Sequence, residues 1–211
     1  MNARRILIAG IGNIFFGDDA FGVETVHTLS HCALPANVAV VDFGTRSYNL
    51  ACALVAGYDA VIFVDAAARG EPPGTLSLVE LDPPAPATES DFAGNGLSVD
   101  PVAVLRLAAA FGVPTRRLYL VSCEPESLGG GNGEIALSST VQAVVPEAVA
   151  LIQSFLVELL SPFPGLRDPT GGGVGRTVTE MAEQTRAGSL TRVGGMRPVD
   201  LLAGGQLPRI G

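Results

Sequence analysis

The sequence is short of the residues from which disulfide frameworks and resident metal centres are usually built. It holds three cysteines, Cys32, Cys52 and Cys123, and two histidines, His27 and His31. The cysteines are odd in number and lack C-x-x-C spacing, so we interpret them as small buried side chains in a reducing compartment. No H-E-x-x-H helix is present, and no Ser-His-Asp or Cys-His arrangement lies near the predicted loops. These absences argue against a resident catalytic zinc and against a covalent intermediate.

Positive charge and long apolar runs are also scarce. Thirteen basic residues face 21 acidic ones, for a net charge of −8, which argues against a nucleic-acid partner because phosphate backbones attract basic surfaces. No uninterrupted apolar run reaches the ~18 residues of a membrane span. The N-terminal stretch MNARRILIAG lacks a small-residue cleavage site and is better interpreted as a first strand. We therefore expect a cytoplasmic protein, a monomer, with neither membrane nor nucleic acid as partner.

Charge divides the chain near residue 162. Residues 1–162 hold 7 arginines and 17 acids, a net charge of −10, whereas residues 163–211 hold 6 arginines and 4 acids, a net charge of +2. The second part is rich in glycine and proline and has no periodicity that would support a core. We predict one domain over residues 1–162 and a flexible tail, without an assigned role, over residues 163–211.

Apolar runs alternate with helical patterns along the first part. Strands are expected at residues 4–10, 38–44, 59–67, 74–81 and 116–125, and helices at 18–31, 45–57, 100–112 and 138–160. This order predicts an α/β fold, a three-layer sandwich with a mostly parallel sheet and helices on both faces. The alternating pattern at 74–81 predicts one antiparallel edge strand. The long Pro/Ala-rich loop 82–99 is expected to be either mobile or functional.

Unusual residues collect where the predicted strands end, which is where sites form in this architecture. They are Gly10 to Asp19 after the first strand, Asp42 to Thr45 after the second, Asp65 after the third, and Glu124 and Glu126 after the last.

The stretch GIGNIFFGDDAFG, directly after the first strand, is open to two interpretations. Gly10 and Gly12 begin a dinucleotide fingerprint, but Phe15 occupies the third glycine position, and two carboxylates would lie beside the bound phosphates. The alternative uses the acids themselves. Asp18 is expected to cap the following helix, while Asp19 and the strand-end Asp65 supply two carboxylates, half of a divalent metal site.

Four segments together resemble a known family. ILIAGIGNIFFGDDAFGVETVHTL, VVDFGTRSYNL, AVIFVDAAARGEPPGTL and VSCEPES are similar, in order and spacing, to the hydrogenase maturation proteases, over roughly residues 4–160. The most specific block is G-I-G-N followed, after four residues, by D-D-x-x-G. The resemblance implies a cytoplasmic endopeptidase with an α/β sandwich fold. Its partner would be the large-subunit precursor of a nickel–iron hydrogenase, from which it removes a C-terminal extension after nickel insertion.

The resemblance also implies a site. The precursor brings the nickel, and no resident cofactor is expected. Asp19 and Asp65 carry over as the two acids that contact this metal, and as catalytic residues that orient the scissile bond for hydrolysis by a metal-polarised carbonyl or a carboxylate-activated water. Asp42 is a secondary candidate for the activating base.

Further positions carry over as substrate contacts. They are Gly12 and Asn13 after the first strand, and Gly44 and Thr45 in the DFGT segment after the second.

One position departs from the family pattern. The family places a histidine shortly before the third helix, where this chain reads GNGLSVDPVAVL, so the position falls on Leu97 or Asn95. Asn95 with the two aspartates would form an all-oxygen set, which suits nickel less well than imidazole. His27 and His31 lie on the first predicted helix, where a surface or packing role is expected. Two alternatives stay open: a non-cleaving checkpoint protein that binds the nickel-loaded precursor, and, more distantly, a dinucleotide-binding oxidoreductase.

Overall fold

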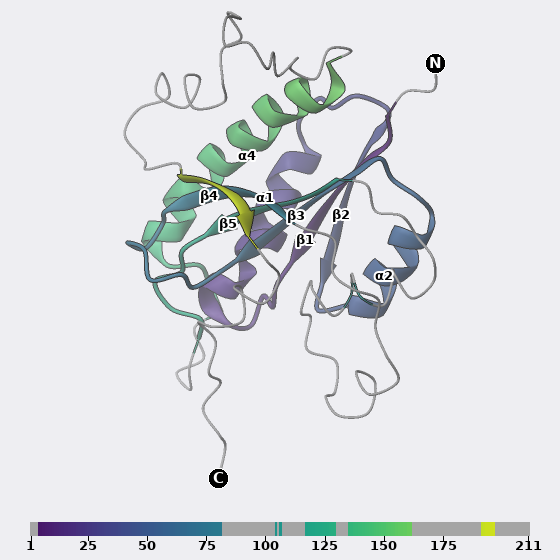
Figure 1. The fold of residues 1–211 in the computed structure, drawn as a ribbon. Coiled ribbons are helices and arrows are strands. Elements are labelled where there is room, and N and C mark those ends of the chain that lie inside the picture. The colour runs from purple at the N-terminus through teal and green to yellow at the C-terminus, as the bar shows by residue number, and fades with distance from the viewer. Residues whose placement is uncertain are drawn as a thin grey trace, which may run out of the picture.

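The computed structural model describes residues 4–81, 104, 106, 117–129 and 135–161, and the backbone of 191–196. The strands are β1 (Ile6–Ile11), β2 (Val38–Gly44), β3 (Ala60–Ala66), β4 (Leu76–Leu81), β5 (Leu118–Cys123) and β6 (Thr191–Met196). The helices are the 3-10 helix η1 (Gly17–Ala20), α1 (Phe21–Ser30), α2 (Ser47–Val55) and α4 (Ser139–Leu160) (Figure 1). The predicted loop 82–99, with Asn95 and Leu97, lies outside the described residues. Of the predicted helix 100–112, Val104 and Arg106 are described, and both are helical.

The strands form one sheet in the order β2-β1-β3-β5-β4-β6. β1, β2, β3 and β5 are parallel, and β4 runs antiparallel to β5. The predicted mostly parallel sheet with one antiparallel strand is therefore confirmed. β6 lies beside β4 and parallel to it. It comes from residues 163–211, which the sequence predicts to be a flexible tail, and it gives β4 a neighbour on both sides. β4 is therefore antiparallel, as predicted, but it is not the edge strand.

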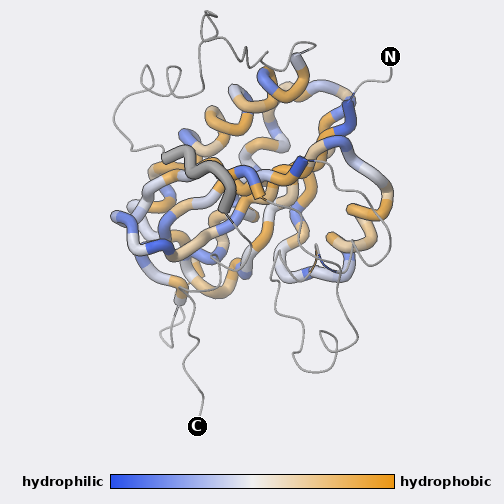
Figure 2. The backbone as a smooth tube through the Cα atoms, in the orientation of Figure 1, coloured by the Kyte–Doolittle hydropathy of each residue, from blue (hydrophilic) through white to orange (hydrophobic). Residues whose placement is uncertain are grey.

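Helices cover both faces of the sheet, as predicted. Alternate residues of β1 divide between two apolar clusters: Ile6 and Ile8 pack with α1 and α4, whereas Leu7 and Ala9 pack with α2. This is the period-2 alternation of a strand buried on both sides. Figure 2 shows hydrophobic residues through the central strands and along much of α4.

α4 is the longest helix of the layer that it forms with α1 on one face of the sheet. Its N-cap is Ser138, whose Oγ accepts a hydrogen bond from the Val141 N–H at 3.2 Å. By length and composition α4 would suffice for a membrane span. It is not an uninterrupted apolar run, because polar residues such as Glu147 lie within it. One face of α4 packs into the core beside α1, which is the behaviour of a core helix.

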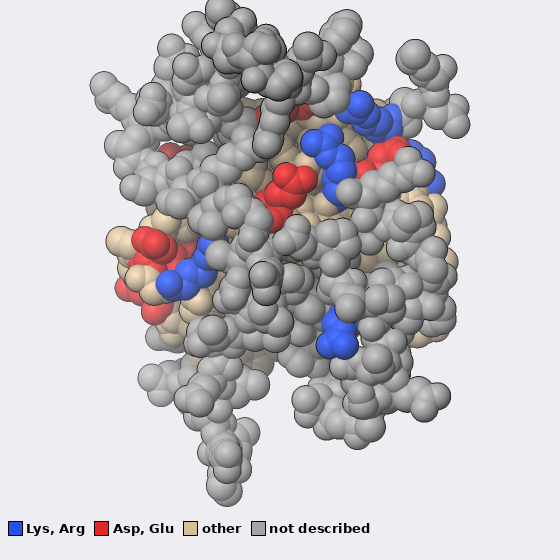
Figure 3. All heavy atoms as spheres, viewed as in Figure 1, with Lys and Arg blue, Asp and Glu red and all other residues tan. Residues whose placement is uncertain are grey.

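α4 spans the sheet from end to end. It begins beside the carboxyl ends of the parallel strands, where the Ser138 N–H contacts Asp18. It finishes beside the start of β1, where Arg4 Nη1 donates to the Leu159 carbonyl at 2.7 Å. The start of α4 therefore marks the end of the sheet where the parallel strands finish, and its last turn marks the end where they begin. On the face drawn in Figure 3, the described acidic and basic side chains are interspersed rather than gathered into a basic stripe.

Candidate functional site at the carboxyl ends of the strands

Gly10 in β1 and Gly22 in α1 allow α1 to lie directly on the sheet. A Cβ on Gly22 would lie 2.1 Å from the Val64 carbonyl oxygen and 2.2 Å from that of Ile11. A Cβ on Gly10 would lie 2.3 Å from the Val26 side chain. Both glycines are therefore required by close packing of helix on strand, which is a different use from approach to a pyrophosphate.

Gly12 turns the chain back over the end of β1. Its φ is +129°, and a Cβ there would lie 1.8 Å from the Asp19 carbonyl oxygen. Its N–H donates to the Gly44 carbonyl at 3.2 Å. Because η1 folds back onto Gly12, this glycine places Asp19 at the mouth of the first loop, next to the segment that follows β2.

Asp18 is fully buried and holds three loop segments together. Its Oδ2 accepts hydrogen bonds from the N–H groups of Glu126 at 2.8 Å and Ser127 at 3.0 Å, and its Oδ1 accepts one from Ser138 at 2.6 Å. Neither η1 nor α1 has a side-chain cap. The prediction that Asp18 caps its own helix is therefore wrong: its carboxylate serves the loop after β5 and the start of α4.

Asp19, the next residue, is only partly buried and makes fewer contacts. Its Oδ2 accepts a hydrogen bond from the Asn13 N–H at 2.7 Å. From the described part of the chain, its Oδ1 receives no hydrogen bond. Burial raises the pKa of the Asp19 carboxyl above its ordinary value, and the hydrogen bond from Asn13 offsets part of this rise.

Asp65 lies near the end of β3, half-buried. Its Oδ1 accepts a hydrogen bond from the Ala66 N–H at 2.9 Å, and it is paired with Ser122 of β5. η1, which carries Asp19, contacts β3 directly. The two aspartates therefore come from adjoining elements at one end of the sheet, and their joint contact with a metal stays a prediction.

Asp42 is placed differently. It is exposed, and its carboxylate lies 3.6 Å from Arg46 Nη2. Gly10 pairs with Asp42 on one side and with Val64 on the other. Because paired residues of parallel strands point to the same face, Asp42 belongs to the α1/α4 face and Asp65, one residue after Val64, to the α2 face.

The four expected substrate contacts lie on two loops that are joined by a hydrogen bond. Gly12 is hydrogen-bonded to Gly44, which has a φ of +50°, and Asn13 and Thr45 are the next residues of the two loops. Asn13 also connects these two loops to the candidate site, because its N–H donates to the Asp19 carboxylate.

Comparisons with known proteins bear on this geometry. The profile of the hydrogenase maturation protease family matches residues 23–155. The chain belongs to this family.

Individual relatives agree with the family match. The hydrogenase 2 maturation protease of Escherichia coli (strain K12) is 33% identical over 157 residues, which are 73% of this chain and 92% of that protein. The hydrogenase expression/formation protein HupD of Rhodobacter capsulatus is 32% identical over 74% of this chain and 75% of its own length. Among solved structures, the hydrogenase maturating endopeptidase HybD from E. coli superposes with a TM-score of 0.60 and 29% identity, covering 74% of this chain and 93% of that one.

One cysteine and both histidines of this member of the maturation protease family are unsuited to the site. Cys123 is buried, and its pKa is raised to about 12, by burial first and then by the charges of Asp18 and Glu124, so the thiol stays protonated. His27 and His31 are exposed at the far end of α1, with ring centroids 5.1 Å apart. His31 Nδ1 lies 2.8 Å from the His27 carbonyl oxygen. Both histidines are therefore remote from Asp19.

Glu124 follows β5 and has a structural role. Its carboxylate accepts hydrogen bonds from the N–H groups of Arg69 at 2.8 Å and Gly70 at 3.1 Å, which fixes the loop between β3 and β4. No three His, Cys, Asp or Glu side chains converge as a metal site within the described ranges. Asp19 and Asp65 are thus two partly buried carboxylates carried by adjoining elements at this end of the sheet.

Proposed function

We propose that the chain is the endopeptidase that removes the C-terminal extension from the large-subunit precursor of a nickel–iron hydrogenase after nickel has been inserted. The observation that carries this proposal is the contrast between two adjacent aspartates. Asp18 uses both oxygens to hold backbone and is inaccessible, whereas Asp19 keeps one oxygen without a hydrogen bond from the described residues, at the mouth of the first loop. A partly buried carboxylate oxygen that receives no hydrogen bond from the described residues is available to a ligand.

The ligand that fits this carboxylate is a metal held by the precursor. Two carboxylates are hard oxygen donors, and nickel prefers nitrogen and sulfur. A site of Asp19 and Asp65, with Asn95 as the third donor, would therefore bind free nickel weakly. It would engage nickel well once the precursor's thiolates already hold the ion, and this makes cleavage depend on metal insertion.

Hydrolysis then follows from position. The docked metal fixes the precursor so that the scissile bond lies beside the two carboxylates, and this orientation supplies much of the rate. The raised pKa of the Asp19 carboxyl makes its ionised form a stronger base, which suits it to accept a proton from the attacking water. Asp42 remains a secondary candidate for the base, although Arg46 neutralises its charge and it belongs to the other face of the sheet.

The test compares the rate of precursor cleavage by variants of Asp19 in the first loop and of Asp65 and Asp59 at the two ends of β3. We expect Asp19→Asn and Asp65→Asn each to reduce cleavage of the nickel-loaded precursor by at least about a hundredfold, the scale on which positioned carboxylates act. Asp59→Asn is the matched control, because Asp59 lies at the other end of β3 and accepts a hydrogen bond from the Arg5 N–H at 2.8 Å. Full cleavage by the Asp19 and Asp65 variants would refute the assignment.

A second candidate is favoured by the residues Leu97 and Asn95, one of which stands where the family has histidine. In this case the chain binds the nickel-loaded precursor without cutting it. Mixing wild-type protein with the loaded precursor separates the two candidates: a stable complex with no shortened product supports the checkpoint, and a shortened product supports the protease.

A further inference from the structure

Five large apolar side chains are exposed around the candidate site, on two separate loops. The exposed fractions are 44% for Ile14, 66% for Phe15, 49% for Phe16, 43% for Leu128 and 64% for Ile135. We call these five residues the apolar rim. Three of them are consecutive in the loop between β1 and η1, where the solvent-facing side chains of a soluble domain are ordinarily polar.

The two loops of the apolar rim are locked together. The Asp18 N–H donates to the Ser127 carbonyl at 3.0 Å, and the Asp18 carboxylate binds the same loop in return. A Cβ on Gly129 would lie 2.8 Å from Phe16 Cα, so the backbones touch. The first loop and residues 127–129 are thus fixed to each other, with Phe16 and Leu128 on the joined segments.

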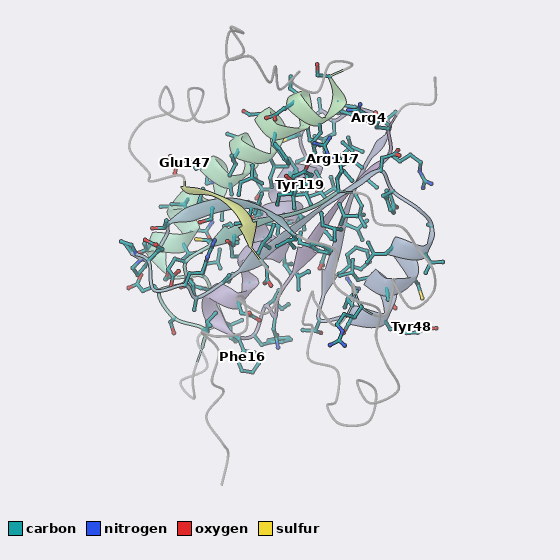
Figure 4. All side chains as sticks on the ribbon, in the orientation of Figure 1. Arg4, Phe16, Tyr48, Arg117, Tyr119 and Glu147 are labelled. Carbon is teal, nitrogen blue, oxygen red and sulfur yellow. The ribbon has the colours of Figure 1, made fainter. Side chains whose placement is uncertain are left out.

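The apolar rim is also continuous with the catalytic loop. The Phe15 N–H donates to Asn13 Oδ1 at 3.0 Å, the Asn13 N–H donates to Asp19, and the Asp19 N–H donates to the Phe16 carbonyl at 3.1 Å. Asp19 and the rim residues Phe15 and Phe16 are therefore held close together within one loop. Figure 4 shows Phe16 projecting from the end of the molecule below the sheet, away from Tyr48 on α2.

A pocket adjoins the rim on the side of α4. Its volume is about 380 Å³, and Gly17, Asp18, Ser127, Ile135, Leu137 and Ser138 are among the residues that line it. This is at the small end of the range for ligand sites. Its wall combines the apolar residues Ile135, Ala136 and Leu137 with polar ones that include Glu126, so a polypeptide that lies across the rim could place a side chain there.

We propose that the apolar rim docks an apolar segment of the nickel-loaded precursor, next in space to the metal-bearing part, and so selects the substrate. This inference rests on the proposed function. The area of the rim favours a substrate over a second copy of this chain. At about 150–250 Å² per aromatic side chain, the rim exposes a few hundred Å², below the ~800 Å² per partner of a stable interface. The hydrogen bonds that join Phe15, Asn13, Asp19 and Phe16 make the rim continuous with the proposed site.

The test measures KM and kcat for the nickel-loaded precursor with two variants. Phe15→Ser alters the first loop, and Leu128→Ser together with Ile135→Ser alters the second. Each is expected to raise KM about tenfold or more, as loss of an anchor side chain does, with kcat nearly unchanged. Val157→Ser is the matched control, since Val157 is 73% exposed near the end of α4 that Arg4 contacts, and its KM should equal that of the wild type.

Direct binding to the precursor separates the outcomes. If the wild type cleaves and both rim variants keep its KM, the rim proposal is overturned and the proposed function stands. If the wild type does not cleave but Phe15→Ser weakens precursor binding, the protease assignment fails and the rim stands. A wild-type dimer in sedimentation that Phe15→Ser dissociates would assign the rim to a second copy and overturn the proposal. Thermal melting identifies a variant that fails to fold, and the variant on the other loop then decides.

Discussion

At the scale of single residues, two neighbouring aspartates have opposite roles. Asp18 is satisfied by three backbone donors, whereas Asp19 has one. The sequence predicts that acids gather at this point, and the role of Asp19 in the site stays a prediction. The sequence cannot distinguish the two by burial, because the donors to Asp18 lie more than a hundred positions away in the chain. The helix-cap expectation for Asp18 failed for this reason.

The raised pKa of Asp19 leads to a prediction about stability. Its folded-state pKa lies above the ordinary value of 3.8, so ionisation at neutral pH opposes folding. We expect Asp19→Asn to unfold at higher urea concentration than the wild type at pH 7. The advantage should shrink as the pH falls toward 3.8, because the wild-type carboxyl regains its proton. An advantage that is constant with pH would contradict this explanation.

At the scale of elements, the glycines after β1 show what sequence patterns convey. Gly10 and Gly12 begin a partial dinucleotide fingerprint in the sequence, and the structure shows that these two glycines and Gly22 are each required by close contact between β1, η1 and the first turn of α1. The pattern that resembled a phosphate loop is thus explained by packing. The strand ends were predictable from alternation alone, because the carboxyl ends of parallel strands share one edge of a sheet.

The Asp18 contacts connect η1, the loop after β5 and the start of α4, so their loss should lower the free energy of unfolding of the domain. Asp18→Ala leaves three backbone N–H groups without an acceptor at the junction of η1, the loop after β5, and α4. We expect a loss of about 3 kcal/mol or more in the free energy of unfolding, since hydrogen bonds to a charged acceptor are lost and buried donors stay unpaired. Urea denaturation provides the measurement, with Asp19→Ala as the adjacent comparison. An equal, small effect of both substitutions would show that the Asp18 contacts are not stabilising.

At the scale of the whole molecule, alternation of strands and helices predicted the layers, because strands buried on both faces are continuous apolar runs that differ from the helical patterns between them. The alternating pattern at 74–81 predicted the direction of β4. Two features were not predictable. β6 has no distinct pattern in the Gly-rich segment from which it comes. The exposure of Ile14, Phe15 and Phe16 was missed as well, because an apolar loop residue looks the same in sequence whether it is buried or presented to a partner.

The central claim is that carboxylates at the strand ends recognise nickel carried by the precursor and so permit cleavage. The most direct measurement is the mass of the large-subunit precursor after incubation with wild-type protein, with the precursor either nickel-loaded or nickel-free. The account predicts loss of a C-terminal fragment from the loaded precursor only, and no such loss with Asp19→Asn. Equal cleavage of the loaded and nickel-free precursors would contradict it.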